Sequence, residues 1–69
     1  MPIKAEEYGL SARETEVFLL LAKNKEARAI ADELFVSFNT VRTHIKNIYM
    51  KLDVHNRREL QDVIDSFAR

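Results

Sequence analysis

Residues 26–52 read EARAIADELFVSFNTVRTHIKNIYMKL and contain two apolar stripes at helical spacing, separated by a short break. The first stripe, at positions 27, 30, 31 and 34, follows the i, i+3, i+4, i+7 pattern of an amphipathic helix over 26–34. A second helix over 38–52 follows Ser37, whose hydroxyl suits the first-turn amide groups. The break therefore predicts a turn between two helices, which is the organisation of a helix-turn-helix.

The helix expected over 38–52 has two chemically different faces. At 100° per residue, four aliphatic residues fall within about 40° of one direction: Val41, Ile45, Ile48 and Leu52. The opposite side carries an amide, a hydroxyl, two long cations and one thioether: Asn39, Thr43, Arg42, Lys46 and Met50. Cations can bind guanine or phosphate, asparagine can pair with adenine, and threonine can meet a thymine methyl. The polar face has the chemistry of a DNA-reading surface, while an ordinary solvated face stays open as the alternative.

Two further helices flank this pair. Ser11 and Glu14 have the spacing of a capping box, which predicts a helix over 11–22 that ends near Asn24. A fourth helix over 57–67 has four apolar residues on one side: Leu60, Val63, Ile64 and Phe67. The sequence thus predicts an all-α domain of four helices that contains a helix-turn-helix.

Charge is balanced over the whole chain but concentrated within it. The 69 residues hold 11 basic and 11 acidic side chains. Residues 37–58 hold five basic residues and one acid, a balance of +4, while the segments before and after each carry −2. This asymmetry favours an anionic partner.

Several function classes are disfavoured by what the sequence lacks. There is no cysteine, and two histidines are too few for a zinc site, so we expect no metal or cofactor. No stretch approaches the roughly 20 apolar residues of a membrane span, and residues 1–7 do not read as a signal peptide. No phosphate loop or nucleophile with a nearby base stands out, so we do not expect an enzyme. These absences favour a cytoplasmic protein.

Several segments together resemble the LuxR-type helix-turn-helix family, which includes DNA-binding domains of many response regulators. They are LSARETEV at 10–17, IADELFVS at 30–37, TVRTHI at 40–45, NI at 47–48, KL at 51–52 and NR at 56–57. The resemblance implies a bacterial transcription regulator that binds duplex DNA with its third helix in the major groove. It also implies that the fourth helix supports a two-fold dimer on DNA.

The resemblance assigns roles to individual residues. Four residues are expected to contact bases: Arg42, Thr43, Lys46 and, from the composition of its face, Asn39. Five are expected to contact phosphates: Thr40 by its matching position, and Lys23, Lys25, Arg28 and Arg58 by location, where solvated surface is the competing interpretation. Glu14 and Arg57 match positions that look like an ion pair between the first and fourth helices.

The chain departs from the family pattern at the fourth helix and at two turns. Three polar residues stand where small or apolar residues favour dimerisation: Gln61, Asp62 and Asp65. We therefore expect a weak or DNA-dependent homodimer. Asn24 and Asp53 stand where the family usually has glycine, which predicts a small cost in stability.

The expected organisation is an N-terminal extension over residues 1–9 and a DNA-binding domain over 10–69. Family members often carry a receiver or ligand-binding domain upstream, so this chain is either a stand-alone regulator or an excised effector domain. A protein-interaction module remains the rival interpretation. In that case the apolar residues Phe38, Met50 and Phe67 would matter most.

Overall fold

The computed structural model describes residues 8–68, and the side chains of residues 8–66. Residues 12–68 form four helices: α2 (Ala12–Ala22), α3 (Ala27–Leu34), α4 (Phe38–Leu52) and α5 (Arg57–Ala68). The described part contains no strand, and none of its helices is long and apolar enough to cross a bilayer. The predicted all-α fold is confirmed. Most of the predicted extension, residues 1–7, and the Phe67 side chain lie outside the described residues.

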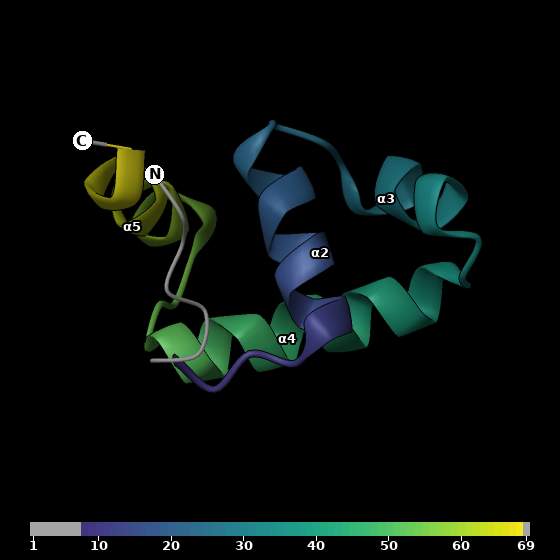
Figure 1. Cartoon of the computed structure of the whole chain (residues 1–69), viewed down its shortest axis with the longest axis horizontal. Coiled ribbons are helices and arrows are strands. Elements are labelled where there is room, and N and C mark those ends of the chain that lie inside the picture. The colour runs from purple at the N-terminus through teal and green to yellow at the C-terminus, as the bar shows by residue number, and fades with distance from the viewer. Residues whose placement is uncertain (1–7, 69) are drawn as a thin grey trace.

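Helix α4 is the longest element and the one against which the others are arranged. It packs against both α2 and α3. In Figure 1, α2 crosses α4, while α3 and α5 lie on opposite sides of α2. Helix α2 thus packs against both helices of the α3–turn–α4 unit. The face of α4 that points away from α2 and α3 is left uncovered by the other described helices.

The core takes apolar side chains from all four helices and from the α4–α5 connector. Its buried members are Val17, Phe18, Leu21, Ile30, Ala31, Val41, Ile48, Leu52, Val54, Leu60 and Ile64. On α2 the buried positions 14, 17, 18 and 21 form one helical stripe. Phe18 belongs to this stripe and is fully buried, whereas Leu20 lies beside it and is only partly buried.

Three helices end with the same backbone motif, in which one residue adopts the left-handed conformation. Asn24, Phe35 and Asp53 have φ values of 63°, 57° and 56°. In each case the next amide reaches back five residues, as Val36 N does to Ala31 O at 3.1 Å and Val54 N to Tyr49 O at 3.0 Å. This is the Schellman arrangement, which usually has glycine at the left-handed position. The prediction for Asn24 is confirmed, and Phe35 at such a position is a finding of the structure.

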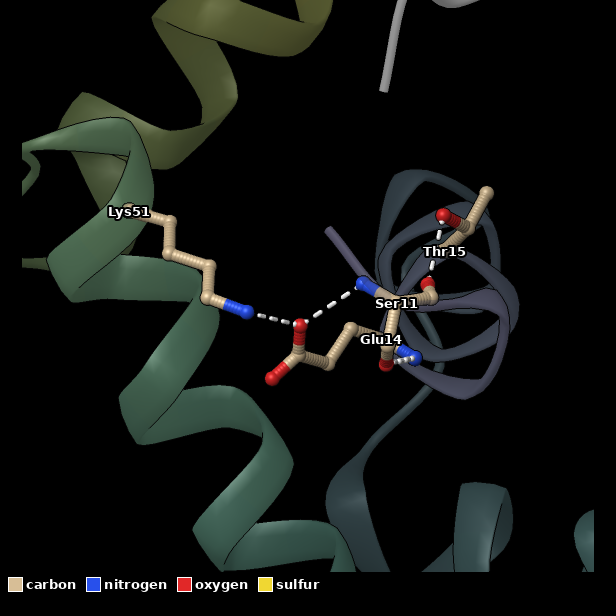
Figure 2. Close-up of polar contacts among 4 residues, drawn as sticks. All are labelled: Ser11, Glu14, Thr15 and Lys51. Carbon is tan, nitrogen blue, oxygen red and sulfur yellow. Dashed lines mark hydrogen bonds and ion pairs between the residues drawn. The ribbon is translucent and has the colours of Figure 1, made fainter. Parts of the chain in front are cut away.

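Helix α2 is attached to α4 through Glu14, as Figure 2 shows. The capping box is present, since Glu14 N donates to Ser11 Oγ at 3.1 Å and Ser11 N donates to Glu14 Oε1 at 2.9 Å. The same Oε1 accepts a hydrogen bond from Lys51 Nζ at 2.5 Å. One carboxylate, 4% exposed, therefore caps α2 and forms an ion pair with α4.

Arg57 does not pair with Glu14, so the ion pair suggested by the resemblance is wrong. Its Nη2 atom donates instead to the backbone oxygen of Leu21 at 3.0 Å. The reason is that Lys51, near the end of α4, already occupies the Glu14 carboxylate, while Arg57 begins α5 beside the last turn of α2. Arg57 thus binds the carbonyl end of α2 instead.

Candidate nucleic-acid interface

The uncovered face of α4 brings the four predicted base-contacting residues together. All four are exposed, and together they line one shallow hollow: Asn39, Arg42, Thr43 and Lys46. Spacings of three or four residues place them in successive turns of one helix face. The face therefore presents an amide, a hydroxyl and two cations within a single depression.

Hydrogen bonds with the backbone fix the hydroxyl groups at the start of α4. Ser37 Oγ accepts a hydrogen bond from Thr40 N at 3.1 Å and lies 2.8 Å from Thr40 Oγ1. Thr43 Oγ1 donates to the backbone oxygen of Asn39 at 3.1 Å. With its hydroxyl engaged by the backbone, Thr43 offers its methyl group to a partner, and Thr40 stays exposed at the N-terminal end of the helix.

The Phe38 ring, at the start of α4, forms a cation–π contact with Arg28 of α3. The Arg28 guanidinium carbon lies 5.1 Å from the centroid of the Phe38 ring, and that of Arg42 lies 5.8 Å from it. Both distances fall within the range of cation–π contacts. The Phe38 ring thus contacts both Arg28 and the predicted base-contacting residue Arg42. Helical periodicity does not predict this contact, because Arg28 and Phe38 belong to different helices.

The remaining predicted phosphate contacts lie apart from the hollow. Lys23 and Lys25 flank Asn24 in the α2–α3 connector, and Arg58 is the second residue of α5; all three are exposed. None of the three lines the hollow, and no hydrogen bond or ion pair among the described residues joins them to its four residues. Their role in phosphate binding stays a prediction.

The fold uses part of the positive charge that the sequence concentrates in residues 37–58. Lys51 is paired with Glu14, and Arg57 binds a backbone oxygen of α2. Arg42, Lys46 and Arg58 are exposed and form no ion pair among residues 8–66. Arg28 joins them from outside the segment, so the cationic surface belongs to α3 and α4 together.

An open groove continues from this surface along the second half of α4 to the α4–α5 connector. Eight residues line it: Arg42, Ile45, Lys46, Tyr49, Met50, Asp53, Val54 and His55. Met50 is 70% exposed. The helical wheel placed Met50 on the polar face, but the contribution of the connector could not be seen from periodicity.

Two further features of the described part of the chain concern metal binding and the predicted dimer face. Residues 8–66 offer no group of three or more His, Cys, Asp or Glu side chains placed to hold a metal ion. On α5, Gln61 Nε2 donates to Asp65 Oδ1 at 3.0 Å, and Asp62 is exposed. The predicted dimer face is therefore polar and satisfies part of its hydrogen bonding within the helix.

Comparison with known proteins gives a consistent result. Residues 8–64 match the model of bacterial regulatory proteins of the luxR family. The chain is 50% identical over 50 residues to the spore germination protein GerE of Bacillus subtilis, an alignment that covers 72% of this chain and 68% of GerE. It is 46% identical over 50 residues to the transcriptional regulatory protein LiaR of Bacillus subtilis, and 40% identical over 50 residues to the response regulator protein VraR of Staphylococcus aureus. Those two alignments each cover 72% of this chain but only 24% of the relative.

Proposed function

Because this chain belongs to the luxR family of bacterial regulatory proteins, we propose that residues 10–69 are a domain that binds duplex DNA and regulates transcription by placing helix α4 in the major groove. The observation that carries this proposal is the exposed hollow formed by four residues of α4. A major groove admits an α-helix, and base edges there present distinct patterns of donors and acceptors.

The four residues of the hollow are suited to different kinds of base contact. Arg42 and Lys46 donate to the O6 and N7 acceptors of guanine, while Asn39 pairs with adenine. The Thr43 methyl group contacts a thymine methyl, because its hydroxyl is held by Asn39 O. These contacts specify sequence.

Contacts with phosphates position the helix without specifying sequence. Thr40 and the first amide groups of α4 meet one strand, because a helix N-terminus carries partial positive charge. Lys23, Lys25, Arg28 and Arg58 extend this contact along the backbone. Together they set the register in which the base-reading residues approach the duplex.

Binding should be measured by fluorescence anisotropy, with labelled duplexes selected from fragments of bacterial promoters. The double variant Arg42→Ala/Lys46→Ala should retain its helical circular dichroism and bind at least about 30-fold more weakly, since each good base contact is worth about 1–3 kcal/mol. Arg13→Ala is the control, because it removes an exposed cation that pairs with Glu16 on α2. It should leave affinity within about twofold.

Salt dependence separates the two kinds of contact. Wild-type affinity should fall steeply as salt rises, and the Lys25→Ala variant should lower the slope of log affinity against log salt by about one. Failure of the folded wild type, including a covalently linked dimer, to bind any duplex at low salt would contradict the proposal.

We also propose that the domain pairs through α5 only when DNA holds two copies on adjacent half-sites. The face that includes Gln61, Asp62 and Asp65 carries acidic groups, which repel one another in a two-fold contact. Sedimentation should show a monomer in solution and two domains on a duplex with half-sites about one turn apart. An Asp62→Ala/Asp65→Ala variant should dimerise more readily, and a stable wild-type dimer without DNA would contradict this part.

Control of the domain is proposed to come from a receiver or ligand-binding domain. The chain spans about a quarter of the length of LiaR and VraR. Joining or separating two copies of this domain would change their effective concentration at paired half-sites. Such a regulator acts in the bacterial cytoplasm, where its DNA lies.

A further inference from the structure

We propose that Phe38 is a positioning residue for DNA binding, which holds Arg28 of α3 and Arg42 of α4 on its ring as one cationic clamp. The inference rests on the proposed function and deepens it. It assigns Arg28 to a phosphate at the edge of the groove that Arg42 reads. It also gives Phe38 a role within DNA recognition rather than in docking a protein partner.

The geometry that carries the inference joins two helices through one side chain. The guanidinium carbons of Arg28 and Arg42 lie 5.1 Å and 5.8 Å from the Phe38 ring centroid. Phe38 is the first residue of α4 and is 38% exposed, so part of its ring is open to solvent. Arg28 is the second residue of α3.

Neither arginine is neutralised by an acid in the described part of the chain. The ion pairs there involve Arg13, Lys51 and His55 instead. Two guanidinium groups therefore share one aromatic ring without a carboxylate between them. Such a pair of like charges creates a local potential that an anion would relieve.

Contact with an aromatic ring leaves an arginine able to bind DNA. A planar guanidinium that rests near a ring face keeps the N–H groups of its edge free for phosphate or guanine. The ring also restricts long side chains that would otherwise populate many rotamers, so less entropy is lost on binding. Phe38 should therefore strengthen binding only if both arginines remain on the ring in the complex.

The position of each arginine decides which part of the duplex it meets. Arg42 lines the hollow with Asn39, Thr43 and Lys46, so it faces base edges. Arg28 comes from the start of the preceding helix, which crosses the DNA backbone in helix-turn-helix complexes. The clamp thus spans a base and a neighbouring phosphate.

The first test compares Phe38→Leu with Phe38→Tyr. Leucine keeps an apolar side chain but has no ring face, so DNA affinity should fall about threefold to tenfold at low salt. Tyrosine keeps the ring and should bind within about twofold of wild type. Phe35→Leu is the matched control, since Phe35 lies three residues earlier in the α3–α4 turn, is 94% exposed, and makes no cation–π contact among the described residues.

A measurement on the free protein tests the geometry without DNA. The side-chain Nε–H resonances of Arg28 and Arg42 should show ring-current shifts that Phe38→Leu abolishes and Phe38→Tyr preserves. The helical circular dichroism of each variant shows whether it has folded. Unshifted arginine resonances in the wild type would overturn the clamp, whatever happens to DNA binding.

A double-mutant cycle then tests the link to phosphate. Arg28→Ala should lower both affinity and the salt slope in the wild type, and it should cost at least about twofold less in the Phe38→Leu background. Equal costs in the two backgrounds, or tighter binding by Phe38→Leu, would overturn the inference while the proposed function stands. A requirement for Phe38 in capture of a protein but not in DNA binding would do the same. Absence of DNA binding by the wild type would overturn both.

Discussion

At the scale of single residues, Glu14 is notable because its acidic side chain is buried. It is almost fully buried, yet it stays charged because it accepts hydrogen bonds from Lys51 and from the Ser11 amide. The Lys51 hydrogen bond, followed by the Ser11 amide, lowers the pKa of Glu14 below its ordinary value of 4.5, and burial opposes this shift only in part. Since the pKa is lower in the folded state, the resulting stability is complete above about pH 4.5 and is lost as pH falls through the folded-state pKa.

Glu14→Gln should therefore destabilise the domain at neutral pH by about 1–3 kcal/mol, because a charged hydrogen bond is lost and Lys51 loses its partner. The deficit relative to wild type should shrink as pH falls below about 4.5. Urea unfolding at pH 7 and pH 3.5 measures both. Glu16→Gln, which disrupts only the exposed pair with Arg13, should change stability by less than about 1 kcal/mol. A deficit for Glu14→Gln that is the same at both pH values would show that its charge is not the cause.

At the scale of helices, the ends of α2, α3 and α4 depend on left-handed residues that are not glycine. Asn tolerates the left-handed conformation well because its short polar side chain can form hydrogen bonds with the nearby backbone. Phe has no such group, so nothing offsets the steric cost of this conformation. Phe35 is 94% exposed, so its strain is not offset by burial. The turn of the helix-turn-helix is thus held in place by the packing of α3 and α4 rather than by local preference.

A graded series of glycine substitutions checks this account. Phe35→Gly should raise the free energy of unfolding by about 0.5–1 kcal/mol, because relief of left-handed strain exceeds the added entropy of the unfolded chain. Asn24→Gly should change it by less than about 0.5 kcal/mol. Thermal unfolding followed by circular dichroism gives the order, and a destabilised Phe35→Gly would mean that the aromatic side chain has a structural role absent from its contacts.

At the scale of the whole molecule, three residues of α5 join it to the other described helices. Leu60 and Ile64 enter the core, and Arg57 donates to the Leu21 carbonyl group at the end of α2. Its first turn is capped locally, since Asn56 Oδ1 accepts from Glu59 N at 2.9 Å. Arg57 therefore connects the helix that carries the proposed dimer face to the body that carries the DNA-binding face.

Arg57→Met should lower stability by about 1–2 kcal/mol, since it removes a charge-assisted hydrogen bond while keeping the apolar stem of the side chain. Hydrogen exchange should become faster in α5 before it does in α4. Arg58→Met, a neighbouring exposed change, should leave stability within about 0.5 kcal/mol and weaken DNA binding instead. Equal loss of stability in both variants would contradict a specific role for Arg57.

The four helices and the residues of the proposed base-reading face could be predicted from the sequence because their signals are local. Apolar spacing gave the stripes of α3 and α4, Ser11 and Ser37 marked two helix starts, and the observed boundaries lie within one residue of those expected. Residues 39, 42, 43 and 46 share a face through helical geometry alone. Their gathering in one hollow follows from the sequence once α4 is a helix.

The partners of the charged side chains were decided only by the tertiary structure. Glu14 meets Lys51 across 37 residues and Arg57 meets Leu21 across 36, distances over which periodicity carries no information. The same holds for Phe38, whose ring receives arginines from two different helices. Sequence determined which residues lie on each helix face because neighbours in a helix repeat every three or four positions. Packing determined which cations are engaged within the fold, because it brings Lys51 to the Glu14 carboxylate and Arg57 to the Leu21 carbonyl group.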